Sequence, residues 1–183
     1  HGSVAYSLGD PTAKYAGRLT LNPISHLDPF GSIILPILLL ILTGGQGPIF
    51  GWAKPVPINP YNFKDPKWDN AKVGLAGPIS NFSVALIFGA AIRFLPLPGF
   101  LLEFFSIIVV LNILLAVFNL IPIPPLDGSH ILFAIFPERL QGLKMFLHEY
   151  GLFLLLFFIF FGLKIVFLIT MILYNLITGY SFI

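Results

Sequence analysis

Charge-free stretches set the expected elements of this chain, because four of them are long enough to matter for a bilayer. They are residues 29–53, 74–92, 104–126 and 150–183, and only the last is interrupted, by Lys164. A helix needs about 20 apolar residues to cross the hydrocarbon core. The last three stretches reach that length, and they predict transmembrane helices at 74–95, 101–121 and 150–177.

The first stretch has a short apolar core at residues 33–42, which contains Pro36 and is followed by Thr-Gly-Gly-Gln-Gly-Pro. A run of about ten apolar residues is typical of a re-entrant or buried segment. If it is re-entrant, eight Lys and Arg residues lie on one side of the membrane and only Arg93 on the other, whereas a full span divides them three against six. Because cytoplasmic flanks are rich in Lys and Arg, we expect residues 31–50 to be re-entrant, with a short span as the alternative.

The polar segments between these stretches are short. Residues 1–9 are expected to be the end of a helix that stops at Gly9-Asp10-Pro11. Residues 16–23 alternate in polarity, and residues 51–63 are punctuated by prolines, which suit an edge strand. These two segments predict a small β element at the membrane surface. The charge distribution predicts a cytoplasmic side that holds residues 1–30, 51–73 and 122–148, with 94–100 outside.

Composition supports this assignment and excludes several classes of protein. Of 183 residues, 57% are hydrophobic and 10% charged, and the mean hydropathy is +0.92, so a water-soluble globule is excluded. A net charge of +2 gives no basis for nucleic-acid binding, and the absence of cysteine excludes disulfides and thiolate metal sites. We therefore expect an all-α polytopic membrane protein in which residues 1–183 form one membrane-embedded domain.

The string Asn-Leu-Ile-Pro-Ile-Pro-Pro-Leu-Asp-Gly at residues 119–128 is the most informative part of the sequence. Its three prolines break a helix at membrane depth, so that Asp127 stands on irregular backbone. Such backbone is tolerated in a membrane only where protein buries it or water reaches it, and an acidic residue there needs a partner. One interpretation is a functional site, and the other is a loop Asp that caps a following helix at 129–136.

A second string, Gly-Leu-Ala-Gly-Pro-Ile-Ser-Asn, opens the second charge-free stretch at residues 74–81. Gly74 and Gly77 would let another backbone approach closely. Pro78 suits a first helical turn. Asn81 would point its side-chain amide into the bundle. The alternative is that this string is only a helix-packing surface, in which the Asn81 side chain is hydrogen-bonded within the protein.

With these pieces in place, the chain resembles the site-2 protease family of intramembrane zinc metalloproteases, in its compact bacterial branch without a PDZ domain. The matching segments fall in the family's order within about the first 130 residues, and they are 1–14, 17–32, 50–63, 76–81 and 119–128. The family carries a His-Glu-x-x-His motif on a transmembrane helix, and its third zinc ligand is the Asp of a Leu-Asp-Gly motif.

The resemblance implies roles for four residues. Asp127 matches the third ligand and His1 matches the second His, so that both are expected to bind Zn²⁺. Asn119 and Asn81 are expected to position the substrate or the oxyanion. The first His and the general-base Glu match no position here, so we expect an N-terminally incomplete chain that holds zinc poorly and does not hydrolyse peptides by itself.

The assignments also depend on the origin of residues 1–3 and on the roles of three other histidines. His1-Gly2-Ser3 also matches the remnant of a purification tag. The pair His148-Glu149 lacks a His four residues on, so it is expected to be an interfacial cap. His130 is expected to hydrogen-bond to a metal ligand, or to make a simple hydrogen bond, and not to bind the metal itself. His26 is expected to be a turn residue.

The resemblance makes an intramembrane zinc endopeptidase in the bacterial cytoplasmic membrane the leading hypothesis. Its expected partners are a transmembrane protein or peptide substrate and the lipid bilayer, with no nucleic acid. A non-catalytic scaffold is the first alternative. A small transporter is the second, since it also uses broken helices, but it would show paired breaks in two related halves.

Overall fold

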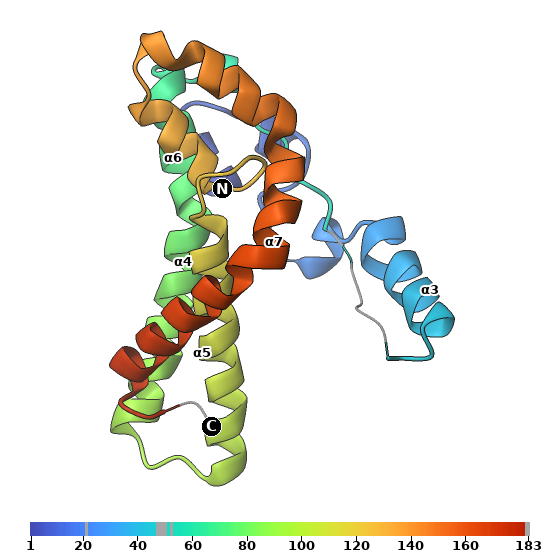
Figure 1. Cartoon of the computed structure of the whole chain (residues 1–183), viewed down its shortest axis with the longest axis vertical. Coiled ribbons are helices and arrows are strands. Elements are labelled where there is room, and N and C mark those ends of the chain that lie inside the picture. The colour runs from blue at the N-terminus through green and yellow to red at the C-terminus, as the bar shows by residue number, and fades with distance from the viewer. Residues whose placement is uncertain (21, 47–50, 52, 182–183) are drawn as a thin grey trace. The chain divides into compact units, whose positions relative to one another are not determined.

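The computed structural model describes residues 1–20, 22–46, 51 and 53–181, and it divides the chain into two compact units, His1–Pro66 and Lys67–Ile183. Each unit is described by itself. That residues 1–183 form one domain stays a prediction. The helices are drawn in Figure 1.

The second unit is built from long helices, and it confirms the expected all-α membrane fold. Its elements are α4 (Pro66–Phe94), α5 (Gly99–Asn119), α6 (Gly128–Ile135), the 3₁₀ turn η4 (Glu138–Leu140) and α7 (Gln141–Thr178). Among the described residues, α4, α5 and the helix that runs from Glu138 to Thr178 are long and apolar enough to cross a membrane. Helices α4 and α7 begin earlier than predicted, at Pro66 and Gln141. Each has a first part with charged residues, which the search for charge-free stretches left out.

The core of this unit lies where α4, α5 and α7 meet. Its buried members are Ala85 and Ile92 of α4, Val109 and Ile113 of α5, and Tyr174 of α7. Buried between α5 and α7, the Tyr174 hydroxyl donates a hydrogen bond of 2.8 Å to Ser106 Oγ. A satisfied polar pair of this kind fixes the register of two helices that otherwise meet through apolar surface.

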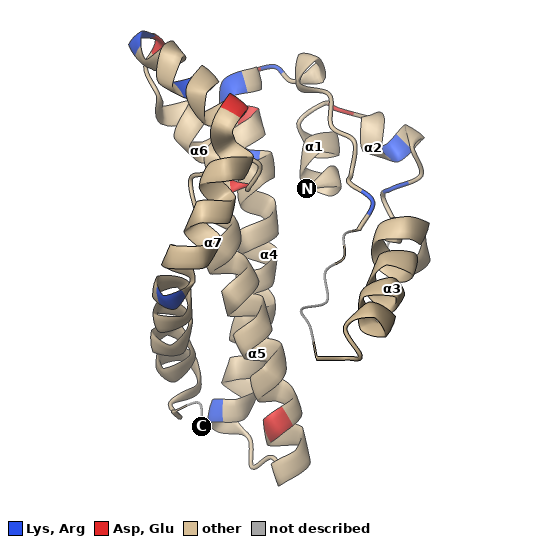
Figure 2. Cartoon of the chain, turned by 45° about the vertical axis from the view of Figure 1, so that its right-hand side comes forward, with Lys and Arg blue, Asp and Glu red and all other residues tan. Residues whose placement is uncertain are grey.

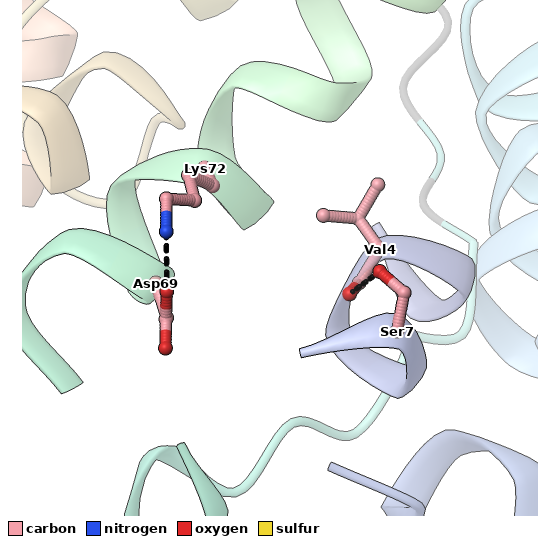
Figure 3. Close-up of polar contacts among 4 residues, drawn as sticks. All are labelled: Val4, Ser7, Asp69 and Lys72. Atoms are coloured by element: carbon pink, nitrogen blue, oxygen red, sulfur yellow. Dashed lines mark hydrogen bonds and ion pairs between the residues drawn. The ribbon is translucent and has the colours of Figure 1, made fainter. Parts of the chain in front are cut away.

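Pro78 lies inside α4 rather than in a first turn, so that expectation was wrong. The helix already runs through the charged residues before it, where Lys72 Nζ donates to Asp69 Oδ1 at 2.7 Å (Figure 3). A proline inside a helix lacks the amide hydrogen that would bond to the carbonyl of Gly74, four positions earlier. Helix α4 nevertheless continues through Pro78 to Phe94.

The first unit consists of short helical pieces. They are α1 (Gly2–Ser7), α2 (Thr12–Tyr15), the 3₁₀ turn η1 (Pro23–His26), the π-helical turn η2 (Pro29–Ile34), α3 (Leu35–Leu42) and the 3₁₀ turn η3 (Pro60–Asn62). The end of α1 is marked by Ser7, whose hydroxyl donates to the carbonyl of Val4 at 2.7 Å (Figure 3). Gly9 then takes a φ of +105°, which a residue with a side chain rarely adopts, and so the chain leaves the helix there.

The predicted β element is not found in the described part of the chain. A single isolated antiparallel bridge joins Leu27 to Ala53, and the Lys54 amide donates to the His26 carbonyl at 3.0 Å. Pro55, Pro57 and Pro60 follow, and proline has no amide hydrogen with which to extend a ladder. Residues 21 and 52 of the two expected strands lie outside the described residues.

The apolar helix Pro29–Leu42 occupies the expected re-entrant segment, of which residues 47–50 lie outside the described residues. At about 1.5 Å per residue this helix is roughly 20 Å long, whereas the hydrocarbon core is about 30 Å thick. Its length suits a segment that enters and returns, and we keep the re-entrant topology as a prediction.

We expect cysteines at positions 20 and 66 to react with a membrane-impermeant maleimide from the same side of the membrane. The reason is the eight-to-one division of basic residues that a re-entrant segment produces. The chain contains no cysteine, so each single-cysteine variant reports one position without background. A cysteine at position 97 serves as the opposite-side control, and labelling of positions 20 and 66 from opposite sides would show that residues 31–50 span.

Candidate functional site

The segment between α5 and α6 is irregular and built on its own backbone hydrogen bonds. The Ile123 amide donates to the Ile121 carbonyl at 2.8 Å, and the Leu126 amide donates to the Ile123 carbonyl at 2.9 Å. Pro124 and Leu126 are buried. The prolines end the helical ladder of α5, and the tight turns then carry the chain to Asp127 as a defined loop, which we call the Asp127 loop (residues 120–127).

Three glycines of the second unit allow other backbone segments to contact this loop directly. A Cβ atom on Gly74 of α4 would lie 2.9 Å from the Asp127 carbonyl oxygen and 3.2 Å from His130 Cβ. A Cβ atom on Gly151 of α7 would lie 2.7 Å from the Pro124 carbonyl oxygen. A Cβ atom on Gly128 would overlap the Leu120 carbonyl. The loop is therefore held by α4, α7 and the end of α5 at positions where any side chain would displace it.

Asp127 occupies the N-cap position of α6, but its side chain makes no capping hydrogen bond. Its backbone is helical, with φ −58° and ψ −34°, whereas a side-chain cap normally has extended backbone. The residue is partly buried, and its carbonyl accepts a hydrogen bond of 3.1 Å from the His130 amide. The geometry thus does not support the alternative that Asp127 is only a helix cap.

The other candidate residues of this unit lie on the helices around the loop. Asn119 ends α5, and its amide group donates to the Leu115 carbonyl of its own helix at 3.0 Å. Asn81 lies two turns beyond Gly74 on α4, is partly buried, and makes no hydrogen bond through its side chain within the described residues. His130 is exposed, and its ring and Cβ lie against Gly74. Asn119 thus directly precedes the Asp127 loop, whereas Asn81 lies about two helical turns from the Gly74 contact.

His1 belongs to the first unit, where it stands at the N-cap of α1 and is exposed. It lines a pocket of about 270 Å³, together with side chains that include Arg18, Thr20, His26 and Val56. The Thr20 carbonyl oxygen accepts a hydrogen bond of 2.9 Å from Nε2 of the His26 ring. Arg18 is buried and donates to the Ser25 carbonyl. Imidazole and polar backbone groups therefore surround one open pocket at the start of α1.

Asp10, which sequence reasoning treated only as a helix stop, is the polar centre of the first unit. It is fully buried, and its carboxylate accepts hydrogen bonds from the Thr12 amide at 3.1 Å, the Asn59 amide at 2.7 Å and Asn62 Nδ2 at 2.7 Å. Burial alone would raise its pKa, but these bonds and one from the Thr12 hydroxyl outweigh burial and lower the pKa to about 2. The Asp-Pro-Thr sequence signals the bonds to Thr12, while those to residues 59 and 62 come from distant chain.

Asp10→Asn should destabilise the first unit by about 2 kcal/mol, because an amide cannot accept all the donors that now face the carboxylate. The folded pKa of about 2 lies below the unfolded value of about 3.9. The stabilisation is therefore present above pH 4 and is lost as the pH falls from about 4 toward 2. Thermal unfolding in detergent at several pH values measures both effects. The variant should lose this acid dependence, and unchanged dependence would contradict the role of Asp10.

The donor types of this chain fit zinc, which binds imidazole nitrogen and carboxylate oxygen. His1 supplies the first type and Asp127 the second, and Gly74 provides space for the Asp127 backbone against α4. Within the described residues, no three His, Asp or Glu side chains are grouped as a metal site. The assignment of His1 and Asp127 as zinc ligands stays a prediction.

Comparison with known proteins gives consistent matches. The model of Peptidase family M50 matches residues 97–162, which include the end of α5, the Asp127 loop and α6. The protein named "Putative zinc metalloprotease YwhC" of Bacillus subtilis is 44% identical over 168 residues, which cover 86% of this chain and 72% of that protein. "Putative zinc metalloprotease Rip2" of Mycobacterium tuberculosis is 34% identical over 130 residues, 70% of this chain and 48% of its own length. No solved structure matches the chain significantly.

Proposed function

The chain belongs to peptidase family M50, the site-2 protease family, and from this membership we propose that the protein is an intramembrane zinc endopeptidase that cuts transmembrane segments of other membrane proteins. It is an integral membrane protein, and three helices among its described residues are long and apolar enough to span. The observation that carries the proposal is the Asp127 loop, which Gly74, Gly128 and Gly151 hold in contact with α4, α5 and α7. The bacterial relatives support a location in the bacterial cytoplasmic membrane.

In this proposal His1 and Asp127 are ligands of the metal. When bound, zinc supplies a Lewis acid that activates water and polarises the peptide carbonyl. The carboxylate of Asp127 supplies oxygen atoms, which are among the ligands that zinc binds in proteins. The Asp127 loop keeps that carboxylate on backbone that protein contacts from three helices, which is how irregular backbone is tolerated at membrane depth.

The asparagines have a positioning role in this proposal. Asn81 has a side-chain amide that is not used by other described residues, and an amide can donate to a substrate carbonyl and accept from a substrate amide. Asn119 uses its amide nitrogen on its own helix, which leaves its oxygen as the group that would face a substrate amide. Residues 53–59, which carry two prolines before η3, offer an extended segment beside which an unwound substrate could add by backbone pairing.

Reconstitution in liposomes with a transmembrane substrate tests the function. The family's first His and general-base Glu match no position of this sequence, so two forms are compared: the 183-residue chain, and the same chain joined to an upstream helix that ends in His-Glu-x-x before His1. We expect zinc-dependent cleavage by the extended form, loss of cleavage on chelation and recovery on adding zinc. The 183-residue form should bind zinc weakly and not cleave. Cleavage that is insensitive to chelation in the extended form would reject a zinc mechanism.

A further inference from the structure

Lys164 lies midway along the packed length of α7. Near the start of that length, Gly151 contacts Pro124 of the Asp127 loop, and near the end Ile177 contacts Gly89 of α4. Lys164 is thirteen residues from each of these contacts, which corresponds to about 20 Å of helix in either direction. Figure 2 shows one basic segment part-way along α7, while the other charges of this unit gather toward the ends of its helices.

The side chain of Lys164 is on the outer surface of the bundle. The buried residues of α7 form a different face, which consists of Gly151, Leu155, Gly162, Val166, Thr170, Tyr174 and Thr178. Lys164 itself is exposed. Its neighbours on the exposed face are also large and uncovered: Phe157 is 63% exposed, Phe160 81% and Leu168 61%. We call Phe157, Phe160, Phe161, Lys164 and Leu168 the Lys164 face.

This position is costly for a charge in a membrane. Lys164 forms no hydrogen bond or ion pair with any described residue. The half-thickness of the hydrocarbon core is about 15 Å, and a lysine at mid-depth does not span that distance with its side chain. Ionisable residues inside membranes usually pair with an opposite charge. We therefore expect the group that pairs with the Lys164 ammonium to come from outside this bundle.

We propose that the Lys164 face binds a transmembrane helix of a partner protein that carries an Asp or Glu near the middle of its span. Charge complementarity selects the carboxylate. Phe160 and Leu168, four residues before and four residues after Lys164, offer apolar surface on either side for the helix to pack on. A second copy of the same face fits poorly, because it would place Lys164 against Lys164. Other spans of this chain offer no alternative, since residues 104–126 are uncharged and Glu103 lies near the start of α5.

The proposed occupant is a partner helix and not the cleaved segment. Lys164 is about 20 Å along α7 from Gly151, the residue that contacts the Asp127 loop, so the proposed charge contact is separate from that loop. The interaction is consequently independent of the proposed proteolysis. It can be tested on the 183-residue chain, whether or not that chain hydrolyses peptides.

Fluorescence transfer in liposomes between the labelled chain and synthetic transmembrane peptides tests the proposal. Each probe is a Leu-Ala helix of about 20 residues, long enough to span, with Glu, Leu or Lys at its centre. The Glu peptide should bind the wild-type chain roughly tenfold more tightly than the Leu peptide, which corresponds to about 1.4 kcal/mol. The Lys peptide should bind no better than the Leu peptide.

Charge reversal separates recognition from general effects on folding. Lys164→Met should remove the preference for the Glu peptide, Lys164→Arg should retain it, and Lys164→Glu should transfer it to the Lys peptide. Glu138→Ala should leave all three affinities unchanged, because Glu138 is an exposed carboxylate in the turn before α7 and is not part of the Lys164 face. Equal binding of the Glu and Leu peptides to the wild-type chain would overturn the proposal, as would self-association of the wild-type chain that Lys164→Met abolishes.

Discussion

Replacement of Asp127 by Ala should lower proteolytic activity by roughly 10³-fold or more, in the form of the protein that carries the complete His-Glu-x-x-His motif. The proposed role as a zinc ligand is the reason, because a catalytic zinc site normally uses three protein ligands. Zinc content should fall together with activity. Thermal unfolding without zinc is compared as well, to separate the role of a ligand from a structural role of the Asp127 side chain.

Activity is measured on a transmembrane substrate, zinc content by elemental analysis, and thermal stability by unfolding in detergent. Glu138→Ala is the matched control, because Glu138 is an exposed carboxylate in the turn before α7 and has no proposed role. The control should keep both activity and zinc. If Asp127→Ala lost stability but kept its zinc, the residue would be structural and the ligand assignment would be wrong.

Replacement of Gly74 by Ala should reduce activity by on the order of 10²-fold through displacement of the Asp127 loop. The added Cβ would lie 2.9 Å from the Asp127 carbonyl oxygen, closer than such atoms approach in proteins, and that oxygen belongs to backbone that cannot rotate away. A misplacement of about 1 Å at a catalytic group is enough for a loss of this size. Alanine is the better helix former by about 1 kcal/mol, so a loss of activity cannot come from weaker helix propensity.

Gly142→Ala provides the control for this second prediction. Gly142 is also in a helix, and a Cβ atom there would meet nothing within 4 Å. Gly151→Ala, whose Cβ would lie 2.7 Å from the Pro124 carbonyl oxygen, should behave like Gly74→Ala. The substrate-dependence of the initial rate and the zinc content are the measurements. Full activity in Gly74→Ala would show that the close contact between α4 and the loop has no part in function.

The sequence by itself determined the class of this protein and the number of its long helices. Uninterrupted apolar stretches near residues 74, 104 and 150 become α4, α5 and α7, because backbone in a bilayer must satisfy its own hydrogen bonds. The proline-rich string before Asp127 likewise gave the helix break, since proline lacks the amide hydrogen that a helix needs. The family followed from the order of short motifs, and the M50 match confirms it.

Pairing between distant segments could not be read from the sequence. The β element failed because prolines at 55, 57 and 60 removed the donors of the expected ladder, leaving one bridge between Leu27 and Ala53. Pro78 was misplaced because hydropathy does not show that α4 begins in the charged turn at Pro66. The role of Asp10 was missed because two of its donors, in residues 59 and 62, are about fifty positions away.

What only the tertiary structure decided is which small residues hold the Asp127 loop and which face of α7 is covered. Gly74, Gly128 and Gly151 are ordinary glycines in the sequence, and their purpose appears only when the atoms opposite them are known. In the sequence, Lys164 is an isolated charge within an apolar stretch, and packing places it on the uncovered face of α7. The physical reason is common to both cases: hydropathy is a property of one residue, whereas close approach and exposure are properties of its neighbours.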